Sequence, residues 1–136
     1  MRLQQSTLLG LYAVIELAKA DGEQLSAADI ADKFDVSINH LAKVLRVLVK
    51  AGLLQAVRGA GGGYRFSGNA KRTTLMDIIE KFEPVSIEGF EHRNSPHHTD
   101  VEAGLAIALT EISEMMQATL RSITIKTMLK IMPGSE

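Results

Sequence analysis

The sequence predicts a mainly α-helical (α+β) fold: a winged helix-turn-helix domain with a two-stranded wing, followed by a long C-terminal dimerisation helix. Two short amphipathic helices lie about three residues apart, a glycine-rich turn between two short strands follows them, and a long apolar helix lies near the C-terminus. We therefore divide the chain into a winged helix-turn-helix domain at 1–83, a loop at 84–99, and a dimerisation helix with a short final helix at 100–136.

The first two helices follow from apolar spacing and a capping signal. Apolar residues recur at helical spacing over 7–20 and widen into a stripe almost all round the helix, so we expect this helix to be buried on more than one side. Ser26 is placed to cap a second helix that ends at Phe34, with Asp29 as its capping-box partner.

A third helix is predicted at 38–51, after a tight connection of three residues. Ser37 caps it, and Gly52 supplies the left-handed residue that ends it. The second and third helices together make the helix-turn-helix, with the third as the recognition helix. Its predicted inward-facing residues are Ile38, Leu41, Val44, Leu45 and Leu48.

The wing comes directly after the recognition helix. Strands are predicted at 53–58 and 64–66, joined by a glycine turn at 59–63. A further helix is expected at 74–82, because apolar residues recur there at helical spacing and Pro84 follows.

Charge is unevenly distributed along the chain. Residues 36–76 contain seven basic residues and no acidic one, whereas the whole chain has 15 Lys and Arg against 16 Asp and Glu. A near-neutral protein therefore carries a segment with a positive local field that net charge hides. The partner that such a field fits most commonly is a polyanion, above all nucleic acid. The seven residues are Lys43, Arg46, Lys50, Arg58, Arg65, Lys71 and Arg72.

The outer face of the third helix has side chains suited to the DNA major groove. Asn39 can pair with an adenine edge, and Lys43 or Arg46 with a guanine edge. Lys50 suits a phosphate, as does Ser37 at the helix N-terminus.

The wing has a residue suited to the minor groove. Arg58 stands next to glycines, and a slim backbone with one guanidinium fits a narrow groove where negative potential is concentrated. A side chain on these glycines would hold the backbone away from the sugar–phosphate rim.

Several other classes of protein do not fit. The glycine run lacks the Gly-Lys-Ser/Thr ending of a P-loop, and Tyr64 takes the place of the third glycine of a dinucleotide fingerprint. No catalytic triad spacing or pair of carboxylates stands out, so we do not expect an enzyme. Without a 20-residue apolar run or a signal-peptide pattern, the chain is expected to be cytoplasmic and not bound to a membrane. It has no cysteine, which removes disulfides and thiolate sites.

The chain resembles the Rrf-type bacterial repressors, a family that includes the iron–sulfur regulator IscR and the nitric-oxide-sensing repressor NsrR. The resemblance covers about residues 1–130 and is most specific in the first 66. It implies a winged-helix homodimer that binds pseudo-palindromic operators on double-stranded DNA. The residues that carry it are Met1-Arg2-Leu3, Thr7, Gly10-Leu11-Tyr12-Ala13-Val14, Ile30-Ala31-Asp32, Val36-Ser37, Ala51-Gly52-Leu53-Leu54 and Val57-Arg58-Gly59-Ala60-Gly61-Gly62-Gly63-Tyr64.

The resemblance implies DNA contacts from the recognition helix and from the wing. It adds His40 and the neighbouring wing residues to the side chains chosen above for their chemistry. The complete set expected to contact DNA is Ser37, Asn39, His40, Lys43, Arg46, Lys50, Arg58, Gly59, Gly61, Gly62 and Tyr64.

One departure from the family concerns the cofactor. Many members hold an iron–sulfur cluster on three cysteines, and the corresponding positions here fall near Phe90, Ser95 and Val101. An acidic ligand of the nitric-oxide-sensing branch matches Leu8. Because iron–sulfur ligation rests mostly on thiolates, we expect no cluster and no cofactor. Natural loss and deliberate replacement of the cysteines both remain open.

The loop at 84–99 contains three of the four histidines, His92, His97 and His98. Together with Glu91 and Asp100 they lie where relatives keep their sensor. One hypothesis is a metal or haem site, and another is a response to pH. The plainer alternative is a solvated polar loop, since adjacent His97 and His98 do not easily bind one metal from a regular helix.

The long helix is predicted at 100–121, with a short helix after Thr124. At 1.5 Å per residue it extends about 30 Å, more than the small winged domain covers, so pairing with a second copy is its expected use. Covering the domain's own core is the alternative, and a coiled coil is disfavoured because the apolar stripe is short. Candidate dimer contacts are Leu105, Ile107, Leu109, Ile112, Met115 and Met116.

Together these features predict a dimeric, sequence-specific transcriptional regulator, with repression as its expected action. The alternatives are a winged-helix module that binds an acidic protein surface, and a regulator that senses metal or haem through the loop histidines.

Overall fold

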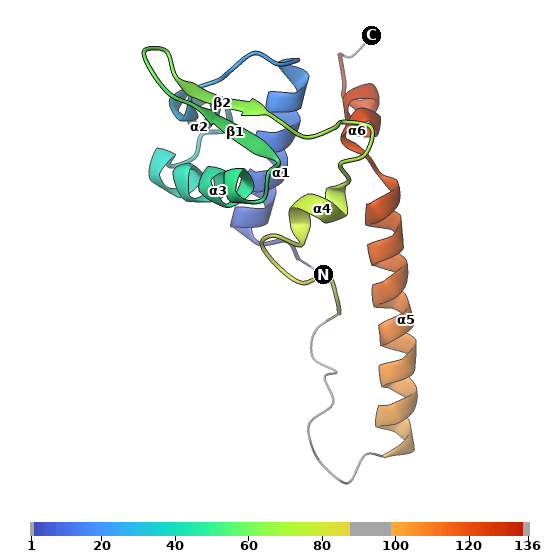
Figure 1. The fold of residues 1–136 in the computed structure, drawn as a ribbon. Coiled ribbons are helices and arrows are strands. Elements are labelled where there is room, and N and C mark those ends of the chain that lie inside the picture. Colours follow the sequence, from blue (N-terminus) through green and yellow to red (C-terminus); the bar gives the residue numbers. More distant parts are fainter. Residues whose placement is uncertain (1, 88–98, 135–136) are drawn as a thin grey trace.

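The computed structural model describes residues 2–87 and 99–134. In chain order the elements are α1 (Gln5–Lys19), α2 (Ala27–Phe34), α3 (Ile38–Lys50), β1 (Leu54–Val57), β2 (Gly63–Phe66), α4 (Leu75–Ile79), α5 (Asp100–Ser122) and α6 (Ile125–Ile131). As predicted, the fold is mostly helical with a two-stranded antiparallel wing after the helix-turn-helix. The N-terminal half of α5 extends beyond the winged-helix body (Figure 1).

The predicted caps of the helix-turn-helix are confirmed. Ser26 and Asp29 form a capping box at the start of α2, and the backbone N–H of His40 donates to Ser37 Oγ over 3.3 Å at the start of α3. Gly52 has a φ of 80°, the left-handed conformation expected where α3 ends.

The core lies between α1, α2, α3 and the wing. Ala13, Val14 and Leu17 of α1 are fully buried, and the inner stripe of α3 packs against them. Ile38 was predicted to belong to that stripe, but it is 47% exposed and lies outside the core cluster. Ile38 is the first residue of α3. At this end of the helix it lies beyond the apolar contacts that bury the other four predicted positions.

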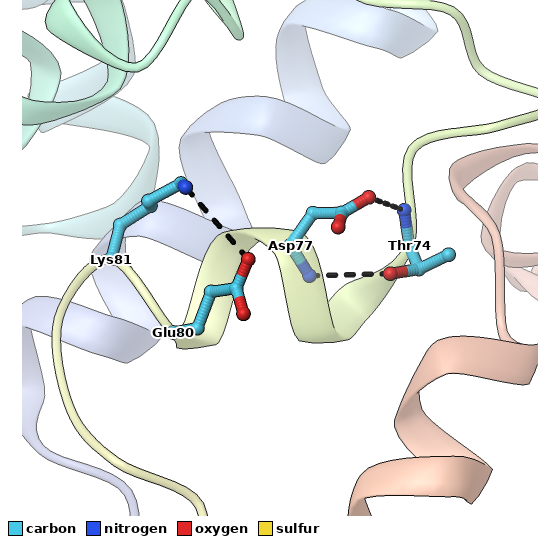
Figure 2. A network of polar contacts seen from close by, with 4 residues as sticks. All are labelled: Thr74, Asp77, Glu80 and Lys81. Carbon is cyan, nitrogen blue, oxygen red and sulfur yellow. Dashed lines mark hydrogen bonds and ion pairs between the residues drawn. The ribbon is translucent and has the colours of Figure 1, made fainter.

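Helix α4 is shorter than the predicted 74–82 (Figure 2). Thr74 caps it: Asp77 N–H donates to Thr74 Oγ1 over 3.2 Å, and Thr74 N–H donates to Asp77 Oδ2 over 2.9 Å. After Ile79 the chain continues in turns, and the exposed Glu80 and Lys81 pair at 3.7 Å. The N–H groups of Lys81 and Phe82 donate three residues back, to the Ile78 and Ile79 carbonyls, so the α-helical pattern is not continued. Glu83 then lies at the first turn of α1, where it accepts two hydrogen bonds.

The C-terminal segment closes the winged domain. Ile125 of α6 is fully buried in the same core as α1, and its N–H donates to the Thr73 carbonyl over 2.9 Å. The C-terminal half of α5 joins a second apolar cluster, in which Met116 and Leu120 pack against residues of and after α4. These contacts fix the C-terminal half of α5 to the domain.

Candidate nucleic-acid interface

Helix α3 presents one polar, basic face to solvent. Its four exposed residues of this kind recur at intervals of four, three and four positions. At about 100° per residue they fall within a sector of roughly 60°, opposite the buried stripe of Leu41, Leu45 and Leu48. The four are Asn39, Lys43, Arg46 and Lys50. The structure thus brings together the amide and the cations that the sequence assigned to base and phosphate contacts.

Two predicted contact residues at the start of α3 have roles inside the chain. Ser37 is exposed, and its hydroxyl oxygen caps the helix. His40 is half-buried, at the edge of the exposed face, and its Nε2 lies 3.1 Å from Ser6 Oγ of α1. The contact with Ser6 joins two residues 34 positions apart, so sequence reasoning had no signal for it.

The wing turn is shaped by its glycines. Gly59 and Gly61 have φ values of 107° and 75°, a region that glycine adopts without strain. A Cβ on Gly62 would lie 2.5 Å from the Val57 carbonyl oxygen. The sequence explained these glycines by close approach to DNA, and the structure adds a reason within the chain.

Two contacts hold the wing against the domain. Tyr64 is half-buried and pairs through its backbone with Leu25, over 2.8 and 2.9 Å. The side-chain amide of Gln24 donates to the Gly61 carbonyl, a contact that sequence analysis missed. Arg58 precedes this braced turn with its side chain exposed, so its guanidinium is presented from a fixed base.

The seven basic side chains of residues 36–76 are all exposed, and none takes part in an ion pair with the residues that the structure describes. On β2, Arg65 faces away from the core, across from Gln55 of β1. Lys71 and Arg72 lie apart from α3 and the wing turn, beside the start of α6, where Lys126 N–H donates to the Ala70 carbonyl over 2.9 Å. The groups on α3 and the wing are therefore free to neutralise phosphates.

Helix α5 has an apolar face that residues 2–87 and 99–134 leave exposed. The exposed members recur at intervals of four, three, four and three positions and include Leu105 at 53% and Met115 at 67% exposure. Leu109 and Met116, also predicted as dimer contacts, are half-buried on the side that faces the domain. Ile107 is 66% exposed but lies about 200° from Leu105, on a different side of the helix. We call the open face the α5 stripe: Val101, Leu105, Ala108, Ile112 and Met115.

The donor set of the chain does not match a cysteine-held cluster. The sequence has no cysteine, and within residues 2–87 and 99–134 no three His, Asp or Glu side chains converge on one point. His92, His97 and His98, together with Glu91, Phe90 and Ser95, lie outside the described residues. Among residues 2–87 and 99–134, no helix has the length and apolarity needed to cross a bilayer.

Comparison with known proteins agrees with the winged-helix fold described above. The model of the family described as "Rrf2: Iron-dependent Transcriptional regulator" matches residues 3–131. The chain belongs to the Rrf2 family. Rrf2 proteins are DNA-binding transcriptional regulators rather than enzymes, as the sequence predicts.

Three Rrf2-type relatives show how far the likeness extends. The HTH-type transcriptional regulator BadM of Rhodopseudomonas palustris is 53% identical over 131 residues, which are 96% of this chain and 83% of BadM. IscR of T. potens has a TM-score of 0.75 at 26% identity, over 96% of this chain and 87% of that one. CymR of B. subtilis, described as the global cysteine regulator, has a TM-score of 0.75 at 27% identity, over 94% of this chain and 95% of CymR.

Proposed function

We propose that this Rrf2-family regulator is a homodimeric, cytoplasmic repressor that binds a pseudo-palindromic DNA operator. The observation that carries the proposal is the α3 face, where Asn39, Lys43, Arg46 and Lys50 share one exposed sector directly opposite the core. With this face in the major groove, the Asn39 amide and the three cationic side chains would reach base edges and phosphates. The braced wing then places Arg58 at the neighbouring minor groove.

A dimer follows from the α5 stripe together with the size of the DNA site. One recognition helix reads only a few base pairs, whereas two copies read two half-sites about 34–36 Å apart. The stripe is apolar and uncovered within the described chain, and a second copy of the same stripe is the partner that would bury it. We propose repression because the chain belongs to the Rrf2 family and because a dimer bound across a promoter would exclude the polymerase.

We further propose that the regulator works without an iron–sulfur cluster, although its family is described as iron-dependent. Thiolates are the usual cluster ligands, and the chain has none. A metal or haem site on His92, His97 and His98 is the alternative. An absorption spectrum and elemental analysis of purified protein separate the two: haem gives a Soret band, and a metal site gives a stoichiometric metal content.

The test of DNA recognition is selection from a random pool of duplexes with the purified protein. We expect enrichment of an inverted repeat with half-site centres about one helical turn apart. Affinity for that repeat should fall steeply between low and moderate salt, with a slope of about −0.9 per phosphate neutralised. Recovery of no enriched motif would contradict the proposal and favour a module that binds an acidic protein surface.

A further inference from the structure

The first turn of α1 is capped by a residue far away in the sequence. Helix α1 has no side-chain cap of its own and no acidic residue in its first turn. Glu83 supplies the missing carboxylate: the Gln4 N–H donates to Glu83 Oε2 over 2.8 Å, and the Thr7 hydroxyl donates to the same oxygen. Because Thr7 is fully buried, Glu83 also satisfies a hydroxyl that water does not reach.

The same turn touches the recognition helix. Ser6, the neighbour of Thr7, has its Oγ 3.1 Å from Nε2 of His40 on α3. His40 lies at the edge of the polar face of α3, next to Asn39. The first turn of α1 therefore contacts Glu83 on one side and the proposed DNA-reading helix on the other.

The segment that follows Glu83 is fixed to α5. The Gln117 side chain donates to the Val85 carbonyl over 2.8 Å, and the Ile87 N–H donates to Ser113 Oγ over 3.0 Å. Val85 and Ser113 are both buried. Three sets of polar contacts, joined by short stretches of backbone, thus link α5 to residues 83–87, Glu83 to the first turn of α1, and that turn to His40 on α3.

We propose that Glu83 and Ser6 are positioning residues for operator recognition, a role that rests on the function proposed above. The packing between α1 and α3 is otherwise apolar, and the hydrophobic effect that drives such packing is not directional. Hydrogen bonds are directional, so the pair between Ser6 and His40 fixes how α3 presents its polar face. The contacts of Glu83 hold the first turn of α1 at a fixed position relative to α5. We infer that this position sets the distance between the two recognition helices of a dimer.

The experiment compares Ser6→Ala, Glu83→Ala and Glu83→Gln with the full-length protein. Affinity is measured for the selected operator and for an unrelated duplex of equal length, together with the midpoint of thermal unfolding. We expect Ser6→Ala to weaken operator binding by roughly fivefold, which corresponds to the usual free-energy contribution of one hydrogen bond. Binding to the unrelated duplex and thermal stability should change little, because non-specific affinity depends on how many phosphates are neutralised rather than on base register.

Glu83→Ala should weaken operator binding by roughly tenfold or more, since it removes an acceptor that serves two donors. Glu83→Gln keeps an acceptor oxygen and should restore most of the affinity. The double variant of Ser6→Ala and Glu83→Ala should lose less than the product of the two single effects, because both act through one turn. Glu80→Ala is the matched control: Glu80 is an exposed carboxylate three residues away whose partner is Lys81, and its removal should leave operator binding unchanged.

Two outcomes would overturn the positioning role while leaving the proposed function intact. One is wild-type operator affinity in both Ser6→Ala and Glu83→Ala. The other is an equal decrease in affinity for both duplexes that follows the decrease in thermal stability, which would mean that the contacts serve only folding. A wild-type protein that does not distinguish the operator from the unrelated duplex would overturn the positioning role together with the proposed function.

Discussion

Ile112→Asp separates the two copies and lowers operator affinity by roughly 100-fold or more, because a second half-site then no longer binds as part of one assembly. Ile112 belongs to the α5 stripe, lies near the middle of α5 and is 45% exposed in the single chain. Pairing with a second copy would bury it, and burying an unpaired carboxylate costs several kcal/mol, about the scale that holds a dimer together. Sedimentation equilibrium measures the dimer, and fluorescence anisotropy with labelled operator measures the affinity.

The matched control for this variant is Ile107→Asp. Ile107 is more exposed than Ile112, at 66%, but it lies on another side of α5, so the change introduces the same charge away from the stripe. The dimer should survive it. A monomeric Ile107→Asp protein, or a dimeric Ile112→Asp protein with full operator affinity, would show that the α5 stripe is not the dimer interface.

Lys43→Ala and Arg58→Ala each weaken operator binding by about 1–3 kcal/mol, the usual contribution of a side chain that reaches a base edge or a narrow groove. Both side chains are exposed and make no ion pair among the described residues, so their removal leaves the fold and the dimer unchanged. Isothermal titration at several salt concentrations measures both effects. The salt slope should become shallower by about one for each phosphate that the variant no longer neutralises.

Lys71→Ala and Arg72→Ala serve as the charge-matched reference for that experiment. These residues belong to the same acid-free segment but lie beside the start of α6, apart from α3 and the wing turn. Their combined replacement should reduce affinity less than Lys43→Ala alone. If the two pairs of variants weakened binding equally, the effect would be one of net charge, and the α3 face would have no special role.

The sequence predicts well those parts of the fold that depend on neighbouring residues. Ser26, Ser37 and Gly52 act over three or four positions, and the structure places each as a helix boundary. Features that depend on the surroundings of a helix were harder to predict. Ile38 has the right periodicity for the core, but at the first position of α3 it is 47% exposed and lies outside the core cluster of the described residues.

On the functional surfaces, too, contacts between residues far apart in the sequence could not be predicted. Residue types alone are enough to predict Lys43 and Arg58 as DNA contacts, because cations next to an amide or a glycine turn suit base edges and a narrow groove, and this assignment stays a prediction. By contrast, the Glu83 cap of α1 joins residues 76 and 79 positions apart, and the contact of Ser6 with His40 joins two separate helices. Neither pairing has a local signal, so only the folded chain shows them.

Footprinting of the selected operator with two reagents tests the central claim most directly, namely that α3 lies in the major groove of each half-site. Dimethyl sulfate methylates guanine N7 in the major groove, and hydroxyl radicals report which deoxyriboses of the backbone are covered. The α3 face and the wing together predict protection in two blocks, one per half-site, with centres about one helical turn apart on the same side of the duplex. Protection should extend into the minor groove next to each block, and Arg58→Ala should remove that extension alone. Uniform protection along the duplex, or a single block that is unchanged by Lys43→Ala, would contradict the account.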